Sequence, residues 1–262
     1  MKEFKAAIGT DEITDKKVRL LRACIAEFMG IMFLNFVGCG SVFKSNVVAV
    51  SLAFGTIAAG TIQTIGHVSG GHINPAVTVG MLVLGKISII RAILYILVQC
   101  AGAIAGTTLI RVFSSEISDA KFGVVSLASG MNVFQGLGIE FSLGFMLVTV
   151  VCGACDTAKL ESKGLSPIFI GMAISAGHFV GIPRTGGAMN PARALGSAVA
   201  MGEYSDHWVY WAGPILGGIA AALIYTYVIG SAETLGPKVY SSVSPDEQEP
   251  HRVNNRSSCK II

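Results

Sequence analysis

The sequence predicts an all-α polytopic membrane protein with six transmembrane helices and two re-entrant half-helices, arranged as an inverted 3+3 repeat. Three observations predict this class: an apolar composition, six stretches long enough to cross a bilayer, and a phrase that occurs twice. Of the 262 residues, 52% are hydrophobic and 13% are charged, with a mean hydropathy of +0.64. Soluble globular proteins carry about twice that share of charged residues. The net charge of +3 is small and unclustered, which argues against a nucleic-acid partner.

Six apolar stretches match the length of about 20 residues that a helix needs to cross a hydrocarbon core. We expect spans at residues 18–40, 47–66, 88–112, 132–155, 165–182 and 207–230. Small residues recur in them, as in LAFGTIAAG and CAGAIAGT, and this spacing lets helices approach closely in a bilayer. The other long segments are a charged cytoplasmic arm, residues 1–17, and a tail, residues 231–262, whose polar composition favours disorder.

The distribution of positive charge predicts the orientation. An even number of spans places both ends on one side, and 14 of the 19 Lys and Arg residues fall on that side. The other side holds Lys44, Arg111, Lys121, Arg184 and Arg193. We therefore expect both termini in the cytoplasm. The location expected for this multi-pass protein is the plasma membrane.

The phrase SGGHINPAVTVG, residues 69–80, returns as TGGAMNPARALG, residues 185–196, with six of twelve positions identical. Glu27 and Glu140 form a second matched pair at nearly the same offset. The channel region 18–230 therefore divides into two repeats, about 18–117 and 118–230, of three spans each. Because three is an odd number, the second repeat enters the membrane from the opposite face.

Each repeated phrase carries a helix-start signature. Asn at the cap and Pro at the first helical position predict helices that begin at Pro75 and Pro191. The apolar runs that follow have about ten residues, roughly 15 Å of helix, so neither crosses the membrane alone. Two such half-helices entering from opposite faces meet near the midplane, and irregular backbone there must be protein-buried or line a water-filled cavity. The repeat therefore predicts a pore.

The junction of the half-helices has a predictable chemistry. The side-chain oxygens of Asn74 and Asn190 would cap their own helices, which leaves both amide NH2 groups as donors toward one point. A water oxygen that accepts from both cannot continue a proton wire, and two positive helix ends repel cations. Carbonyls before each cap are expected to form acceptor ladders that line the pore: Gly70, Gly71, His72, Gly187, Ala188 and Met189.

These residues resemble the aquaporin, or major intrinsic protein, family in its water-selective, animal-type subclass. The likeness rests on the two phrases Asn74-Pro75-Ala76 and Asn190-Pro191-Ala192 with the matched glutamates, and it covers residues 18–230. The resemblance implies an aquaporin-like bundle, a homotetramer and one pore per subunit.

The resemblance also implies an outer selectivity filter, whose four positions are Phe54, His178, Gly187 and Arg193. Glycerol-conducting relatives typically carry Gly in place of His178, Asp in place of Ala194 and Pro-Leu in place of Tyr210-Trp211, so this sequence favours water. Gly187 departs from the Cys, Thr, Ser or Ala that water channels often have there, which leaves the narrowest point less defined.

Several polar residues are assigned supporting roles. Glu27 and Glu140 are expected to accept hydrogen bonds from the loops, although buried carboxylates also suit a proton relay. Gln99 is expected to anchor the first loop, and His67 suits either the pore wall or loop support. No metal site, cofactor or catalytic residue is expected, because the histidines lack acidic or Cys partners and no nucleophile and base stand at useful spacing.

The sequence therefore predicts a passive channel that passes water down an osmotic gradient, excludes protons and ions, and is not an enzyme. Its expected partners are water, the lipid bilayer and further copies of itself. Two alternatives stay open: a channel of the aquaglyceroporin type for small neutral solutes such as glycerol, urea, ammonia or hydrogen peroxide, and a junctional structural protein with weak permeability.

Overall fold

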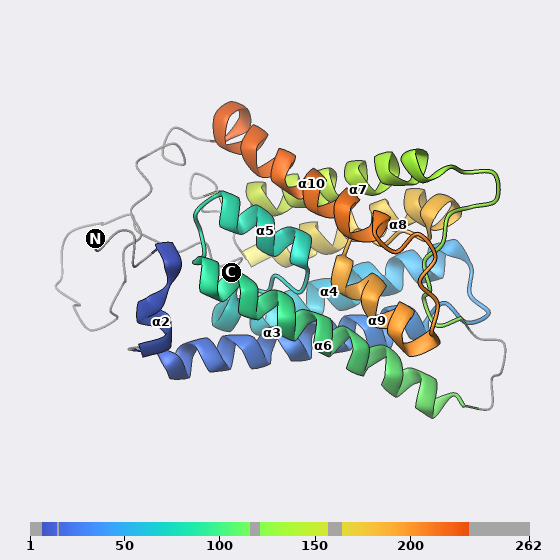
Figure 1. Ribbon diagram of the computed structural model, residues 1–262, viewed down its shortest axis with the longest axis horizontal. Coiled ribbons are helices and arrows are strands. Elements are labelled where there is room, and N and C mark those ends of the chain that lie inside the picture. The colour runs from blue at the N-terminus through green and yellow to red at the C-terminus, as the bar shows by residue number, and fades with distance from the viewer. Residues whose placement is uncertain (1–6, 15, 116–120, 157–163, 231–262) are drawn as a thin grey trace.

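Long helices run side by side along the length of the molecule, and two short helices lie among them (Figure 1). The structure, a computed structural model, describes residues 7–14, 16–115, 121–156 and 164–230. The expected tail, residues 231–262, lies outside the described residues. No strand occurs in the described part of the chain, which confirms the all-α class.

Six helices of the described chain are long and apolar enough to cross a membrane, as predicted. They are α3 (Lys17–Gly40), α4 (Val47–Ser69), α6 (Ile89–Phe113), α7 (Val133–Ala154), α8 (Ser166–Thr185) and the span Val209–Ile229, which combines α10 (Val209–Ile224) with the π-helix η2 (Tyr225–Ile229). Large apolar side chains are exposed along their outer faces, whereas carboxyl, amide and guanidinium groups are buried inside. This distribution suits a protein whose solvent is lipid.

Local sequence explains where several spans begin and end. The side chains of Asn46, Ser88 and Asn132 cap α4, α6 and α7 by accepting a hydrogen bond from a first-turn backbone N–H. Gly70 and Gly186 end α4 and α8 in the left-handed conformation, which glycine adopts without steric cost. These two glycines turn the chain into the two repeated loops.

The two predicted half-helices are α5 (Pro75–Val83) and α9 (Pro191–Met201). Both begin at the expected proline. In Figure 1, α5 lies in the left half of the bundle and α9 in the right half, so together they cover the length that one long helix covers alone. A further short helix, α2 (Thr10–Thr14), occurs in the N-terminal arm, where the sequence predicted only a charged segment.

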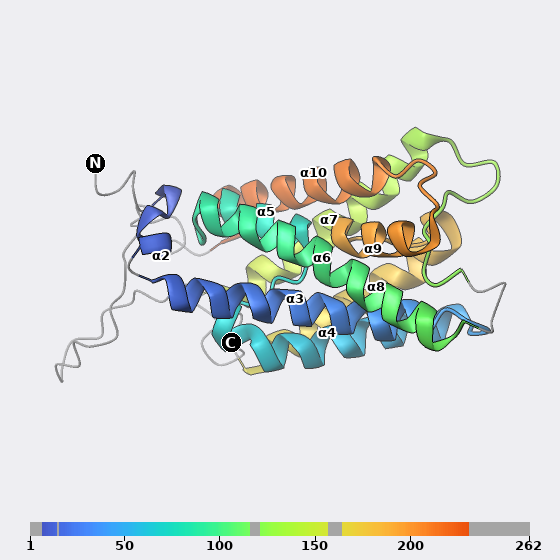
Figure 2. The same ribbon diagram turned by 60° about the horizontal axis from the view of Figure 1, so that its bottom comes forward.

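Helix packing repeats between the two halves (Figure 2). In the first half α3 packs on α4 and α6, and in the second half α7 packs on α8 and α10. Each half-helix packs on a long helix of the other half, α9 on α6 and α5 on α10. A Cβ at Gly102 would collide with the carbonyl oxygen of Phe28, and one at Gly217 with that of Phe141. The small residues therefore permit the close helix contacts that the sequence predicted.

Candidate functional site

The two half-helices start at side chains that cap them. Asn74 Oδ1 accepts from the backbone N–H of Ala76 at 2.8 Å. Asn190 Oδ1 accepts from the N–H groups of Ala192 and Arg193 at 3.0 and 3.2 Å. The oxygen of each amide is thus engaged by its own helix, and each NH2 group points away from it.

The two loops are also joined to each other across the centre. Asn74 Nδ2 donates to the carbonyl of Met189 at 3.0 Å, and Asn190 Nδ2 donates to the carbonyl of Ile73 at 2.8 Å. An amide nitrogen carries two N–H groups, so one per asparagine is used between the loops and one is left for the pore. Sequence reasoning left both N–H groups for the pore, because nothing in the repeat shows which backbone groups of the two loops meet.

The residue before each asparagine has an unusual backbone. Ile73 and Met189 have φ values of 43° and 54°, in the left-handed region that non-glycine residues seldom adopt. This conformation aims their carbonyls at the opposite asparagine. Such strain costs roughly 1–3 kcal/mol and persists only where the surroundings enforce it.

Two buried carboxylates enforce the loop conformation. Glu27 accepts from the N–H groups of His72 and Ile73 at 2.9 and 2.6 Å. Glu140 accepts from those of Ala188 and Met189 at 3.0 and 2.8 Å. Each carboxylate also accepts from a hydroxyl at the start of its loop, Ser69 or Thr185.

Gln99 lies beside the first carboxylate. Its Nε2 donates to Glu27 Oε2 at 2.8 Å and lies 3.1 Å from Thr78 Oγ1. The side chain therefore anchors the carboxylate that holds the first loop. Because these bonds occupy the oxygens of Glu27, the geometry favours loop support over a proton relay.

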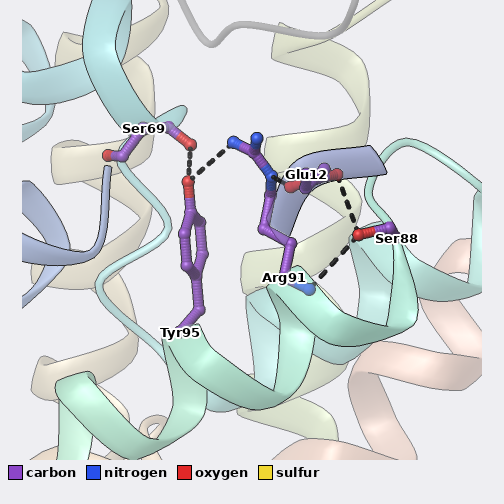
Figure 3. Close-up of polar contacts among 5 residues, drawn as sticks. All are labelled: Glu12, Ser69, Ser88, Arg91 and Tyr95. Atoms are coloured by element: carbon purple, nitrogen blue, oxygen red, sulfur yellow. Dashed lines mark hydrogen bonds and ion pairs between the residues drawn. The ribbon is translucent and has the colours of Figure 1, made fainter. Parts of the chain in front are cut away.

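A chain of polar contacts connects α2 to the first loop (Figure 3). Glu12 accepts from Ser88 Oγ at 2.9 Å and pairs with Arg91 Nε at 2.7 Å. Arg91 donates to the hydroxyl of Tyr95 at 3.3 Å, and that hydroxyl donates to the carbonyl of Ser69 at 2.7 Å. Sequence reasoning missed these residues; the pairing of Glu12 with residues 76 and 79 positions later leaves no local pattern to find.

Three of the four expected filter residues lie together. The rings of Phe54 and His178 stack with centroids 4.3 Å apart and planes inclined by 13°. The guanidinium carbon of Arg193 lies 4.9 Å from the centroid of the Phe54 ring. Arg193 also donates from NH1 to the carbonyl of Gly123 at 2.6 Å, in the loop between α6 and α7.

Two buried polar atoms of this group have no hydrogen-bond partner among the described residues. They are Nε2 of His178 and Nε of Arg193. Nδ1 of His178 lies 2.9 Å from the carbonyl of Ile174, which can only accept, so the proton of a neutral ring sits on Nδ1. Nε2 is then an acceptor and Arg193 Nε a donor, so water can donate to the first and accept from the second.

A narrow cavity of about 30 Å³ connects the filter to the junction. One water needs about 10–15 Å³, so few fit side by side. Its walls include apolar side chains and the named polar groups, among them Phe54, Gly71, His72, Ile73, Asn74, Val77, His178, Ala188, Met189, Asn190 and Arg193. Of the six expected ladder residues, four line this cavity, and the other two, Gly70 and Gly187, are not among the residues that line it.

The remaining predicted residues are placed as follows. His72 is buried at the cavity, with Nδ1 3.2 Å from Thr78 Oγ1. Gly187, the fourth filter position, packs against α8, where a Cβ on Gly181 would lie 2.6 Å from its Cα. His67 is exposed, does not line this cavity and has no hydrogen bond to the described part of the first loop, so its role stays a prediction.

Residues 14–225 match the family model described as "MIP: Major intrinsic protein". The chain belongs to the major intrinsic protein, or aquaporin, family. It is 39% identical to Aquaporin-1 of Canis lupus familiaris over 251 residues, which cover 89% of this chain and 93% of the relative. It is 37% identical to Aquaporin FA-CHIP of Pelophylax lessonae over 253 residues, with the same coverage.

Members of this family are membrane channels, so the protein is not an enzyme. Among solved structures, the aquaglyceroporin from Plasmodium falciparum resembles the fold with a TM-score of 0.71. The match covers 80% of this chain and 97% of that one, at 23% identity. At that identity the likeness supports the fold, and the substrate has to be argued from the site.

Proposed function

We propose that this aquaporin-family protein is a passive, water-selective channel that works down an osmotic gradient. The observation that carries the proposal is the convergence of Phe54, His178 and Arg193 on a narrow cavity. The two aromatic rings restrict the width, while Nε2 of His178 and Nε of Arg193 offer one acceptor and one donor. Water replaces its lost hydrogen bonds at such a pair, whereas a larger polyol meets the stacked rings.

Exclusion of protons and ions is proposed from the two ends of the half-helices. The remaining N–H groups of Asn74 and Asn190 donate to a passing water oxygen, which fixes the direction of its hydrogens. The positive helix ends and the Arg193 guanidinium oppose cations within the same narrow passage.

A second candidate is conduction of ammonia or hydrogen peroxide alongside water. The observation that favours it is Gly187, which adds no side chain at the fourth filter position. Both molecules are close to water in size and both form hydrogen bonds. Glycerol is disfavoured by the His178 and Phe54 stack.

We also propose that the protein spans the plasma membrane with both termini in the cytoplasm and assembles as a homotetramer. In support of a shared side, α2 and the end of α10 lie toward the same end of the bundle in Figure 1. Exposed apolar side chains on the long helices offer surface for lipid and for neighbouring subunits. The tetramer itself is proposed from the family.

The experiment that tests the filter compares water and glycerol permeability of proteoliposomes carrying His178→Gly and Phe54→Ala. Both changes widen the passage, so glycerol permeability should rise several-fold. Exposed residues of the same types serve as matched controls, His67→Ala and Phe134→Ala, and should leave it unchanged. Wild-type exclusion of glycerol in both filter variants would show that these rings do not form the constriction.

A further inference from the structure

One buried amide lies behind the outer filter and has no part in the mechanism above. Asn35 of α3 is fully buried. Its Nδ2 lies 2.9 Å from Thr107 Oγ1, 3.2 Å from the carbonyl of Ala103 and 3.3 Å from the carbonyl of Arg193. The first two acceptors belong to α6 and the third belongs to α9. A single amide therefore links α3 and α6 to the first turn of the half-helix that carries the filter arginine.

This contact completes the anchoring of the Arg193 backbone. Its N–H donates to Asn190 Oδ1 at 3.2 Å, on the pore side of the helix start. Its carbonyl accepts from Asn35 and, at the longer distance of 3.4 Å, from the hydroxyl of Ser197. Because both the N–H and the carbonyl of Arg193 are hydrogen-bonded, its backbone is fixed in place. From that position the guanidinium reaches the Gly123 carbonyl and the Phe54 ring.

The surroundings of Asn35 are shaped to admit this contact. A Cβ on Gly196, one turn after Arg193, would lie 2.5 Å from Asn35 Nδ2. On the same stretch of α3, a Cβ on Gly38 would collide with the ring of Phe54. One turn after Asn35, Cys39 lies against Gly123, whose Cβ would come within 2.6 Å of the sulfur. This stretch of α3 thus packs against the first turn of α9, the Phe54 ring and Gly123, whose carbonyl accepts from Arg193.

The second repeat contains the equivalent contact between helices, at a half-helix that carries Val77 in place of an arginine. By the offset of the paired glutamates, Asn35 corresponds to Val148, and both are fully buried. A Cβ on Gly80, the counterpart of Gly196, would lie 2.8 Å from Val148 Cγ1, which confirms the correspondence in space. Thr107 corresponds to the buried Ala222 at the offset of 115 residues that relates VQCAGAIAG, from Val98, to GPILGGIAA, from Gly213. The junction behind Val77 is therefore apolar.

We propose that Asn35, supported by Thr107, is a positioning residue for the selectivity filter and holds Arg193 through its backbone carbonyl. Polar side chains, Asn35 and Thr107, lie behind Arg193. The equivalent residues behind Val77 are apolar. A buried amide is costly unless it is hydrogen-bonded, and Oδ1 of Asn35 has no partner among the described residues. Keeping an amide here therefore calls for a role that a valine does not fill. The proposal rests on the proposed function, because it explains how the filter is kept selective.

The test is Asn35→Val, which installs the residue of the second repeat, with Asn35→Ala as a second variant that adds no bulk. The readouts are the ratio of glycerol to water permeability and the rate of proton leak in proteoliposomes. We expect one or both to rise by about two- to tenfold, the change that corresponds to one net hydrogen bond. The control is Thr61→Val, which alters a buried hydroxyl with no partner among the described residues, outside the cavity.

Introducing Asn35→Val into an Arg193→Val background separates positioning from general structure. If Asn35 acts through Arg193, the Asn35→Val substitution changes neither the glycerol-to-water permeability ratio nor the proton leak any further in the variant that lacks the guanidinium. Unchanged readouts in both Asn35 variants would overturn the proposal, and so would an equal change with and without Arg193.

Wild-type protein in the same assay keeps the two proposals apart. Wild-type glycerol flux that matches water flux would refute the water-selective function. Proton leak would then still decide whether Asn35 positions Arg193.

Discussion

At the scale of single residues, the two half-helices differ most at the equivalent positions Val77 and Arg193. Asn74 and Asn190 do the same work in both, since each caps its helix and donates to the opposite loop. Arg193 alone adds a guanidinium next to the aromatic pair. The asparagines therefore build the junction, and the arginine gives the half of the passage beside α9 its charge.

Replacing that arginine should weaken the exclusion of charge. We expect Arg193→Val to keep water permeability and to raise cation leak about tenfold or more, because a like charge within a few ångströms opposes a cation by roughly 1–4 kcal/mol. Conductance of reconstituted bilayers measures this leak.

The control for lost positive charge is Arg184→Gln, at an exposed residue on the last turn of α8. Its conductance should equal that of wild type. A bilayer conductance of the Arg193 variant that stays at the wild-type level would contradict an electrostatic role for the filter arginine.

Some residues that occur in both halves could be placed from the sequence, whereas the backbone conformation of others could not. The pairing of Glu27 with Glu140 predicted loop support, and the structure shows matching hydrogen bonds. The left-handed backbone of Ile73 and Met189 gave no signal, because neither residue type favours it. The exposure of His67 depends on the rotation of α4 about its axis, which an apolar run does not determine.

At the scale of helices, close packing depends on backbone contact. Gly217 of α10 faces the carbonyl of Phe141 on α7, and Gly102 of α6 faces that of Phe28 on α3. The recurrence of small residues predicted such contacts, but which glycine meets which carbonyl followed only from the structure.

Adding a methyl group at one of these contacts should be destabilising. We expect Gly217→Ala to lower stability by about 1–3 kcal/mol, the usual cost of overpacking a tight interface. The midpoint of thermal unfolding in detergent measures the effect. Gly138→Ala on α7 is the matched control, because its Cβ would meet nothing within 4 Å. Equal midpoints for the two variants would contradict the close contact.

The short helix α2 should depend on its ion pair. Glu12→Gln removes the charge that pairs with Arg91, at side chains that are 14% and 22% exposed. We expect backbone hydrogen exchange in residues 9–14 to accelerate several-fold, with a loss of global stability of only about 0.2–1 kcal/mol.

Glu203→Gln breaks a more exposed pair with Lys121, 3.6 Å long, and should not affect exchange in α2. Unchanged exchange in α2 of the Glu12 variant would show that other contacts hold this helix.

At the scale of the whole molecule, the sequence predicted six spans and two half-helices with boundaries within three residues of those observed. Hydropathy and the Asn-Pro starts are local signals, and both were sufficient here. The contacts between the loops and the link from α2 to the first loop were not predictable, because they join residues that only the fold brings together.

We propose above that the pore passes water and excludes larger solutes and protons. The most direct test is light-scattering stopped flow on proteoliposomes of the wild-type protein, with water, glycerol and proton fluxes measured on one preparation. We expect water permeability far above that of protein-free vesicles, with no matching rise for glycerol or protons. Glycerol flux that rises in step with water, or water flux no greater than that of empty vesicles, would contradict it.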